Sequence, residues 1–501
     1  MDGTRQYRLT EIVDWAANKS DQNDFLPRNT YWIYGLPGIG KTSLAHSICA
    51  RLHDQKQLAG AFFCRRDDPH LSEPRNILPT LIYKLARIFP PFRTIVANCL
   101  RSDPNLTSES FRDSIFLDLL RSVPKRPNDI LVFVIDAFDE CGDNRSRPSL
   151  LKLLTDAVTH APWLKFIITS RPEADIQRFF DSLTQSSYLK CDLAADQEAS
   201  DDLRTLAMRE FNTVAQDWCL PLPWPEESLL DSIISQANGL PIFIKTLALN
   251  LRNCEDPTEF LRATSEDSAG AGSGVQYRLY SSILKSRILR HKDEFRRMIG
   301  VLLVAAPYRP LSQETIAELA GVRPNLVAMW VNELSSLLYR DEWTNGGIRV
   351  RHLSISEFLL SGDCPRDYQI NLQDANVQLG ISCLKTMVHQ LRFNICGLED
   401  SRLANADIKD LQSRIVYNIP DSLQYSSLYW SDHLCFAPEE NDQRVWDSLE
   451  EFFEGLWPLF WIELLSILGM VPMGVPSLRR VISWARVSSA PACILGNSDW
   501  Q

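Results

Sequence analysis

One stretch, WIYGLPGIGKTSLAHSI from Trp32 to Ile48, constrains the fold more than any other part of the chain. An apolar run gives way to glycines, then to a lysine and a threonine, in the pattern GxxxxGK[ST] over Gly35–Thr42. Glycines let backbone N–H groups turn toward one concavity, and a following helix presents its positive N-terminus there. We therefore expect a strand over Tyr31–Tyr34, a phosphate-binding loop, and a helix over Ser43–Leu52.

The side chains of this loop suit a nucleotide with Mg²⁺. Lys41 supplies a positive charge for the β- and γ-phosphates, and Thr42 supplies a hydroxyl for the metal. The pattern reads phosphates rather than bases, so by itself it leaves ATP and GTP open. The residues expected to bind the nucleotide here are Gly35, Pro37, Gly38, Gly40, Lys41, Thr42 and Ser43.

A second motif, ILVFVIDAFDEC from Ile130 to Cys141, predicts a strand buried on both faces, because its apolar run is continuous. Asp136 stands at the carboxyl end of this strand, where open α/β sheets bind ligands. It is the expected metal ligand beside Thr42. Asp139 and Glu140 follow closely, so one of them is expected to orient or deprotonate a water.

Two further segments complete a predicted sheet. GAFFCRRD, over 60–67, reads as a short strand, and WLKFIITSRPEADI, over 163–176, reads as an apolar strand that ends near Arg171. Arg171 is a candidate sensor of the γ-phosphate, and a solvated arginine at a strand end is the alternative. Strands that alternate with helical stretches predict an α/β fold, a parallel sheet in three layers.

Composition limits the function classes. A chain of 501 residues is expected to hold several domains, and its net charge of -11 argues against a nucleic-acid binder that works through bulk charge. Twelve scattered cysteines without a CxxC pair indicate a reducing, cytoplasmic compartment. The apolar segment 455–476 contains Glu463 and is expected to form a buried helix rather than a membrane span.

At this point the motifs resemble a known family. GLPGIGKT, VIDAFDEC and IITSRPE, in this order and at this spacing, are similar to the NACHT domain of the STAND class of signalling NTPases. The small Ala137 directly after Asp136, with acids downstream, matches the NACHT form of the second motif. The resemblance favours ATP and ADP as the nucleotides.

The resemblance extends toward the C-terminus. ANGLPIFIKTLA resembles the GxP segment of a helical domain, which implies that Pro241 packs on the adenine. RHLSISEFLL resembles a winged-helix histidine motif, which implies that His352 contacts the β-phosphate of ADP; a purely structural histidine is the alternative. The segments 391–400 and 423–434, and the GTR that ends at Arg5, resemble fungal NACHT proteins related to heterokaryon incompatibility.

These observations divide the chain into five parts. We expect a lead-in helix over 1–28, the nucleotide domain over 29–190, a helical lid with linker over 191–275, a winged helix over 276–365, and a mostly α-helical region over 366–501. Family members often carry an effector domain before the GTR and repeats at the end. The sequence leaves open whether the chain is complete.

The expected function is a switch: ADP holds the domains closed, exchange for ATP opens them, and opened protomers associate as a homo-oligomer that signals to an unknown protein partner. Slow ATP hydrolysis would reset it, in fungal self/non-self recognition or programmed cell death. The alternatives are a conventional ATPase or kinase with rapid turnover, a winged-helix DNA-binding regulator, and a scaffold that has lost nucleotide. DNA binding is disfavoured because the candidate recognition helix, 324–337, contains no lysine or arginine.

Overall fold

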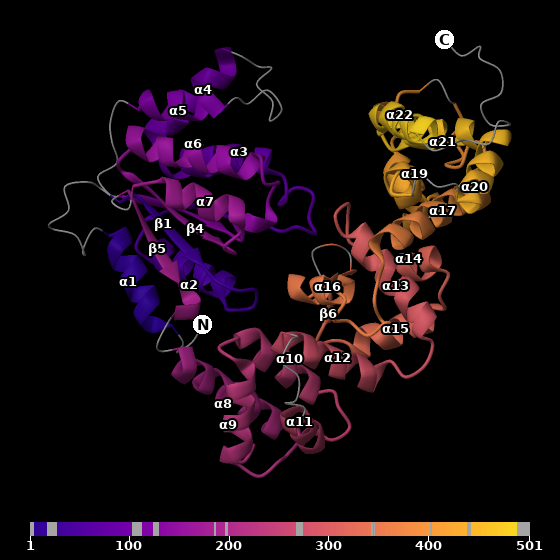
Figure 1. Ribbon diagram of the computed structural model, residues 1–501. Helices are drawn as coiled ribbons and strands as arrows, with labels where there is room; N and C mark the ends of the chain where they lie inside the picture. Colours follow the sequence, from indigo (N-terminus) through magenta and orange to yellow (C-terminus); the bar gives the residue numbers. More distant parts are fainter. Residues whose placement is uncertain are drawn as a thin grey trace. The chain divides into compact units, whose positions relative to one another are not determined.

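The computed structural model describes residues 5–17, 28–102, 113–123, 130–184, 187–195, 199–266, 274–341, 344, 346–400, 403–437 and 442–487. The chain forms two compact units, Met1–Leu279 and Tyr280–Gln501, and each is described by itself (Figure 1).

A parallel sheet forms the centre of the first unit, as predicted. It has five strands, whereas the sequence indicated four and missed the edge strand at Tyr188–Asp192. Its strands lie in the order β2-β3-β4-β1-β5. Every residue of β3 and β4 is buried, which explains their continuous apolar runs. The strands are β1 (Thr30–Tyr34), β2 (Leu58–Phe63), β3 (Leu131–Asp136), β4 (Leu164–Ser170) and β5 (Tyr188–Asp192).

Helices cover both faces of this sheet, which gives the predicted three layers. In Figure 1, α1 and α2 lie on one side of the sheet, and α3, α6 and α7 lie on the other. The helices are α1 (Gln6–Ala16), α2 (Lys41–Asp54), α3 (Ile77–Ile88), α4 (Pro90–Ser102), α5 (Asp113–Arg121), α6 (Ser146–His160) and α7 (Ala174–Ser182), with short 3₁₀ turns η1 (Pro74–Asn76), η2 (Phe138–Glu140) and η3 (Leu193–Ala195).

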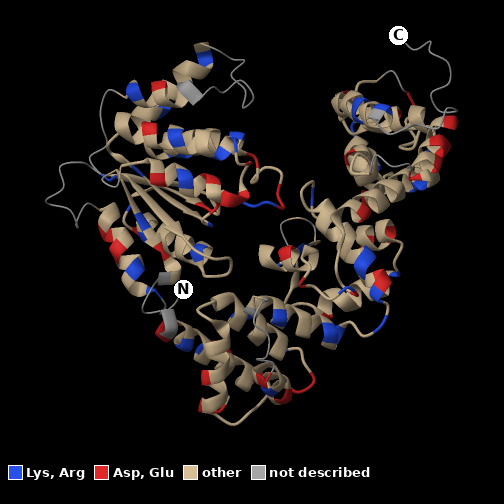
Figure 2. Cartoon of the chain, viewed as in Figure 1, with Lys and Arg blue, Asp and Glu red and all other residues tan. Residues whose placement is uncertain are grey.

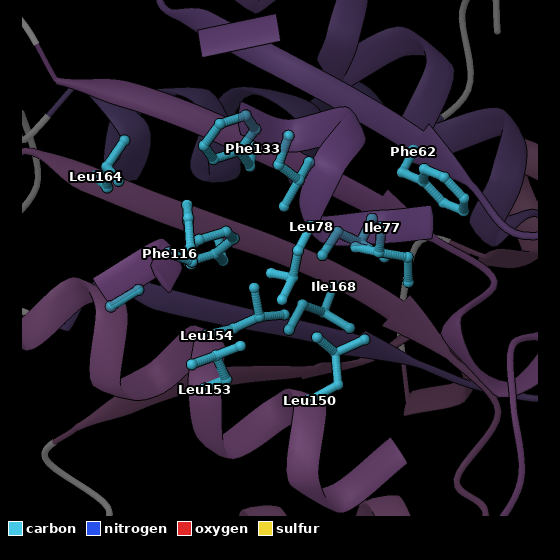
Figure 3. Close-up of a cluster of buried hydrophobic side chains, with 14 of the residues drawn as sticks. Phe62, Ile77, Leu78, Phe116, Phe133, Leu150, Leu153, Leu154, Leu164 and Ile168 are labelled. Atoms are coloured by element: carbon cyan, nitrogen blue, oxygen red, sulfur yellow. The ribbon is translucent and has the colours of Figure 1, made fainter. Parts of the chain in front are cut away.

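The main core of the first unit lies between the sheet and α3, α5 and α6. Phe133 and Ile168, from alternate positions of β3 and β4, pack with Leu78, Phe116 and Leu154 of these helices (Figure 3). Successive strand residues point to opposite faces, so the neighbours of these two residues face the layer that contains α2. Because both faces of the sheet are buried, the register of its strands is fixed. The carboxyl ends of β1, β3 and β4, where the sequence motifs lie, are therefore held at one edge.

A set of four helices follows the sheet: α8 (Ala199–Asp217), α9 (Glu227–Ala237), α10 (Pro241–Leu251) and α11 (Pro257–Glu266). Most of the predicted linker SEDSAGAGSG lies outside the described residues. The next helix, α12 (Val275–Arg287), begins in the first unit and continues into the second.

The second unit begins with helices and a hairpin. The elements are α13 (Lys292–Ala305), α14 (Gln313–Ala320), α15 (Pro324–Glu333), the antiparallel strands β6 (Leu338–Asp341) and β7 (Gly347–Val350), and α16 (Leu353–Leu360). Ser312 caps α14, and Gly321 ends it in a left-handed conformation. The predicted helix over 324–337 is shorter than expected, because its last residues turn into β6. Asn345, between the two strands, lies outside the described residues.

The remaining part is helical, as predicted, with α17 (Leu372–Gln390) packed along α19 (Asp421–Leu434). The other elements are η5 (Asn405–Asp407), α18 (Leu411–Asn418), α20 (Gln443–Glu454), α21 (Trp457–Ile467) and α22 (Val471–Val487). The expectation of one buried helix over 455–476 is wrong. A turn at Gly469 divides the segment, and Leu459 and Ile462 are exposed. Among the described residues, no helix is long and apolar enough to cross a membrane.

Candidate functional site

The phosphate loop lies between β1 and α2, as the sequence predicts. Gly38 (φ 77°) and Gly40 (φ 99°) adopt left-handed backbone conformations, which residues with a Cβ rarely adopt. The helix starts at Lys41, two residues earlier than expected, so its first N–H groups belong to the end of the loop itself. These amides and the helix dipole make the loop an anion-binding concavity.

Lys41 is folded over the start of the loop. Its Nζ donates to the carbonyl oxygens of Gly35 at 2.8 Å and of Leu36 at 3.0 Å. Burial lowers the pKa of Lys41 to about 8, although the carboxylate of Asp139 acts in the opposite direction. A bound phosphate would raise this pKa again, because an adjacent anion favours the ammonium.

The two predicted metal ligands lie close together although β1, which precedes the loop with Thr42, and β3, which ends at Asp136, are not neighbours. β4 lies between β1 and β3, and Thr169 of β4 donates from its Oγ1 to Oδ1 of Asp136 at 2.5 Å. The side chain of Thr42 lies close enough to this carboxylate to act on its pKa. Asp136 is 1% exposed, and burial raises its pKa, while the side chains of Thr169 and Thr42 act to lower it.

Oxygen donors of this kind suit Mg²⁺, which prefers one or two carboxylates together with phosphate and water. The pair of Thr42 and Asp136 therefore fits the predicted metal. Thr169 was missed by sequence reasoning. The sequence shows Thr169 only as a polar residue near the end of an otherwise apolar strand. Its place beside Asp136 becomes evident only when the strand order is known.

Ala137 turns the chain sharply after β3. Its φ of 52° is left-handed, and its N–H donates to Oγ1 of Thr169 at 2.9 Å. A non-glycine residue in this region carries strain, and a small side chain reduces the steric cost. The turn begins η2, which holds the two remaining acidic candidates, Asp139 and Glu140.

Asp139 and Arg171 are brought together, but in a way that the sequence did not suggest. Oδ1 of Asp139 accepts the backbone N–H of Arg171 at 2.9 Å, and Oδ2 lies 3.3 Å from its Nε. Asp139 is 2% exposed. Its carbonyl oxygen accepts from Arg147, whose Nε pairs with Asp175 at 2.7 Å. Asp139 thus fastens η2 to the end of β4 and orients Arg171.

Glu140 lies in a different environment. Oε2 of Glu140 accepts the backbone N–H of Arg66 at 3.2 Å, from the segment after β2. Burial raises the pKa of Glu140 to about 7, and the neighbouring charge of Asp139 acts in the same direction. A carboxyl group with this pKa can exchange a proton near neutral pH. Of the two acidic candidates, Glu140 is therefore better suited to accept a proton from water.

The segment with Pro241 lies against the loop. Pro241 is the first residue of α10, and the N–H of Ile242 donates to the carbonyl oxygen of Gly38 at 3.3 Å. The approach is close: a Cβ on Gly38 would lie 2.2 Å from Cγ2 of Ile242. The lid and the phosphate loop therefore form one packed region, and glycine at position 38 is required for the contact.

His352 lies in the second unit. It caps α16: its Nδ1 accepts from the N–H of Ser354 at 3.2 Å and lies 2.7 Å from the Oγ of Ser354. The hydroxyl of Tyr280 lies 2.9 Å from the same Oγ. The assignment of His352 to the β-phosphate stays a prediction.

The sequence comparisons agree with these motifs. The family model "Nephrocystin 3, N-terminal" matches residues 7–171, which include β1 to β4 and both phosphate-site motifs. The chain is 23% identical over 495 residues to the vegetative incompatibility protein HET-E-1 of the fungus Podospora anserina, and the match covers 90% of this chain. This chain spans about a third, 34%, of the length of that relative.

Solved structures show more distant similarity. The Walker-type ATPase paby2304 of Pyrococcus abyssi has a TM-score of 0.33 and 14% identity, covering 71% of this chain and 95% of that one. The Orc1 protein of Aeropyrum pernix, solved in complex with DNA, has a TM-score of 0.30 and 14% identity, covering 71% and 90%. The strand order and the loop, rather than these scores, carry the assignment to the P-loop NTPase fold.

Proposed function

We propose that this P-loop NTPase, which is related to a fungal NACHT protein of the heterokaryon-incompatibility type, is a signalling switch set by ADP and ATP. One observation carries the proposal: the loop of Gly35–Thr42 leads into α2, which packs beside β3 and the buried carboxylate of Asp136 at its end. This arrangement combines an anion site with an oxygen site for Mg²⁺.

Binding would use the loop amides, Lys41 and the two oxygen ligands. The ammonium of Lys41 would exchange its bonds to the Gly35 and Leu36 carbonyl oxygens for phosphate oxygens. Thr42 and Asp136 would hold the metal, which when bound neutralises phosphate charge. Ser43, at the start of α2, would add a further backbone N–H.

Hydrolysis would be the reset step. Glu140, with its pKa near 7, would accept the proton of the attacking water, and Arg171 would face the γ-phosphate. The carboxylate of Asp139 already holds Arg171. Asp139 would therefore position this arginine rather than deprotonate water.

Switching would depend on the lid and on the second unit. The helices α13–α15 and the hairpin support the winged-helix interpretation of this region. Pro241 would pack on the adenine and His352 would contact the β-phosphate of ADP, as the family resemblance implies. A nucleotide moves such an equilibrium only through its different affinities for the two states. Opened chains would then associate, and by analogy with HET-E-1 the output would be an incompatibility response.

A conventional ATPase is the second candidate, because Glu140 is equipped for proton transfer at neutral pH. The DNA-binding alternative has less support. The helix α15, PNLVAMWVNE, has no basic residue, and Figure 2 shows basic and acidic residues interspersed along both units. Phosphate contacts from lysine and arginine supply much of the affinity for DNA.

The experiment is to measure the mass and the turnover of the full chain together. The switch predicts monomers with ADP, larger assemblies with a non-hydrolysable ATP analogue, and hydrolysis slower than about 1 s⁻¹, the lower end for ordinary enzymes. Lys41→Ala should abolish the response, whereas Lys152→Ala, at an exposed position on α6, should preserve it. Faster turnover without any change in mass would favour the conventional ATPase.

A further inference from the structure

Carbonyl groups of the phosphate loop are held from outside the loop. The oxygen of Pro37 accepts from Nε2 of Gln276 at 3.2 Å, and the oxygen of Ile39 accepts from Nη2 of Arg5 at 2.9 Å. The carbonyl between them, that of Gly38, is bonded to the lid. Three consecutive peptide groups are therefore fixed by residues far away in the sequence.

Because the peptide bond is planar, the direction of each carbonyl group also determines the direction of the next N–H group. In a trans peptide, the C=O of one residue and the N–H of the next point in opposite directions. With the oxygen of Pro37 directed at Gln276, the N–H of Gly38 points away from Gln276. With the oxygen of Ile39 directed at Arg5, the N–H of Gly40 points away from Arg5. Such turned-in amides are the donors that a phosphate loop offers.

We propose that Gln276 and Arg5 are positioning residues of the phosphate loop, which hold the amides of Gly38 and Gly40 toward the phosphates. This inference rests on the proposed nucleotide function and adds to it two residues that neither the loop motif nor the second motif contains. Neither residue needs to contact the nucleotide, because each acts through a carbonyl oxygen of the loop.

Both side chains are placed for this role by their burial. Gln276 is 8% exposed at the start of α12, and Arg5 is 4% exposed before α1. The backbone N–H of Arg5 also donates to Oδ2 of Asp202 at 2.8 Å, so the segment is anchored to α8. Buried polar groups of this kind are costly unless they are hydrogen-bonded, which favours a fixed geometry.

Gln276 also connects the loop to the helix that leaves the unit. α12 continues beyond Leu279, so a displacement of α12 would pull on the carbonyl of Pro37 and turn the amide of Gly38. Nucleotide affinity would thereby depend on the position of α12, and by linkage bound nucleotide would favour one position of this helix.

The test measures the dissociation rate of a fluorescent ADP from the full chain. Gln276→Leu keeps the approximate size of the side chain but removes the donor to Pro37. We expect ADP to be released about tenfold faster, which is the effect of weakening one hydrogen bond from a loop amide to the charged phosphate. Arg5→Met should behave in the same way, whereas Arg5→Lys, which keeps a charged donor, should recover part of the loss. The matched control is Gln236→Leu, which removes a bond of the same kind from Gln236 to the carbonyl of Ser265 in the lid.

Two additional readouts separate positioning from packing. The melting temperature of nucleotide-free Gln276→Leu should equal that of Gln236→Leu, and its ratio of ADP affinities with Mg²⁺ and with EDTA should equal that of the wild type. Release at the wild-type rate, or a melting temperature that falls below that of the control variant, would overturn the inference. A wild-type chain that binds no ADP would instead overturn the proposed function.

Discussion

Glu140→Gln is expected to stabilise the chain at alkaline pH while it abolishes ATP hydrolysis. Glutamine keeps an oxygen that accepts the N–H of Arg66, but it carries no charge to desolvate. The proposed proton acceptor is lost. Stability and activity should therefore change in opposite directions, as is common for residues held in an unfavourable environment for function.

The magnitude follows from the pKa of Glu140. It is about 7 in the folded chain, mainly because of burial, against 4.5 for the free side chain. This difference corresponds to about 3 kcal/mol. The folded chain binds the proton more tightly, so this group reduces stability as pH rises from 4.5 to 7, and the full loss is present above pH 7. Glu140→Gln should therefore gain about 3 kcal/mol more at pH 8 than at pH 4.5.

The assay is urea unfolding at both pH values, following the transition that added ADP shifts, since that transition reports the nucleotide-binding unit. Glu255→Gln, at an exposed position in the same unit, is the control and should show no such difference. In the wild type, the hydrolysis rate should rise with pH, with a midpoint near 7. An equal effect of Glu140→Gln at both pH values would refute the reasoning, as would retained hydrolysis.

Further substitutions test other parts of the site. Gly38→Ala should cost about 1–3 kcal/mol by thermal unfolding, because its φ of 77° is strained for alanine and its Cβ would lie 2.2 Å from Ile242; adding Ile242→Ala should recover only the part due to the clash. Asp136→Asn should still accept from Thr169 but should make ADP affinity, measured by calorimetry, insensitive to EDTA. His352→Ala should weaken ADP more than ATP and increase self-association in sedimentation; if neither changes, His352 serves only to cap α16.

The local structure that was predicted correctly depends on residues close in sequence. The strand, the loop and the following helix lie within one short segment, so glycine spacing and apolar runs suffice, although the helix begins two residues earlier than expected. Asp136 was correctly placed at the end of β3, because the continuous apolar run of a buried strand stops at its first charged residue. Even its contact with Thr42 follows from the rule that ligands bind at the carboxyl ends of parallel strands.

What the sequence did not reveal depends on tertiary contacts. Thr169 acquires its role only because β4 lies between β1 and β3. The bond between Asp139 and Arg171 changes the interpretation of Asp139 from proton transfer to the positioning of Arg171. The contacts of Gln276 and Arg5 with the loop join segments 239 and 34 residues apart. The GTR that ends at Arg5 marks a resemblance, but no local pattern indicates the contact partner of either residue.

The most direct test of the account is to count the nucleotide that the purified chain carries. The protein is denatured, the released nucleotide is identified by ion-exchange chromatography, and Lys41→Ala is treated in parallel. The account predicts nearly one ADP per chain, absent from Lys41→Ala. A chain that arrives empty and hydrolyses ATP rapidly would contradict it, because the loop would then serve turnover rather than a locked resting state.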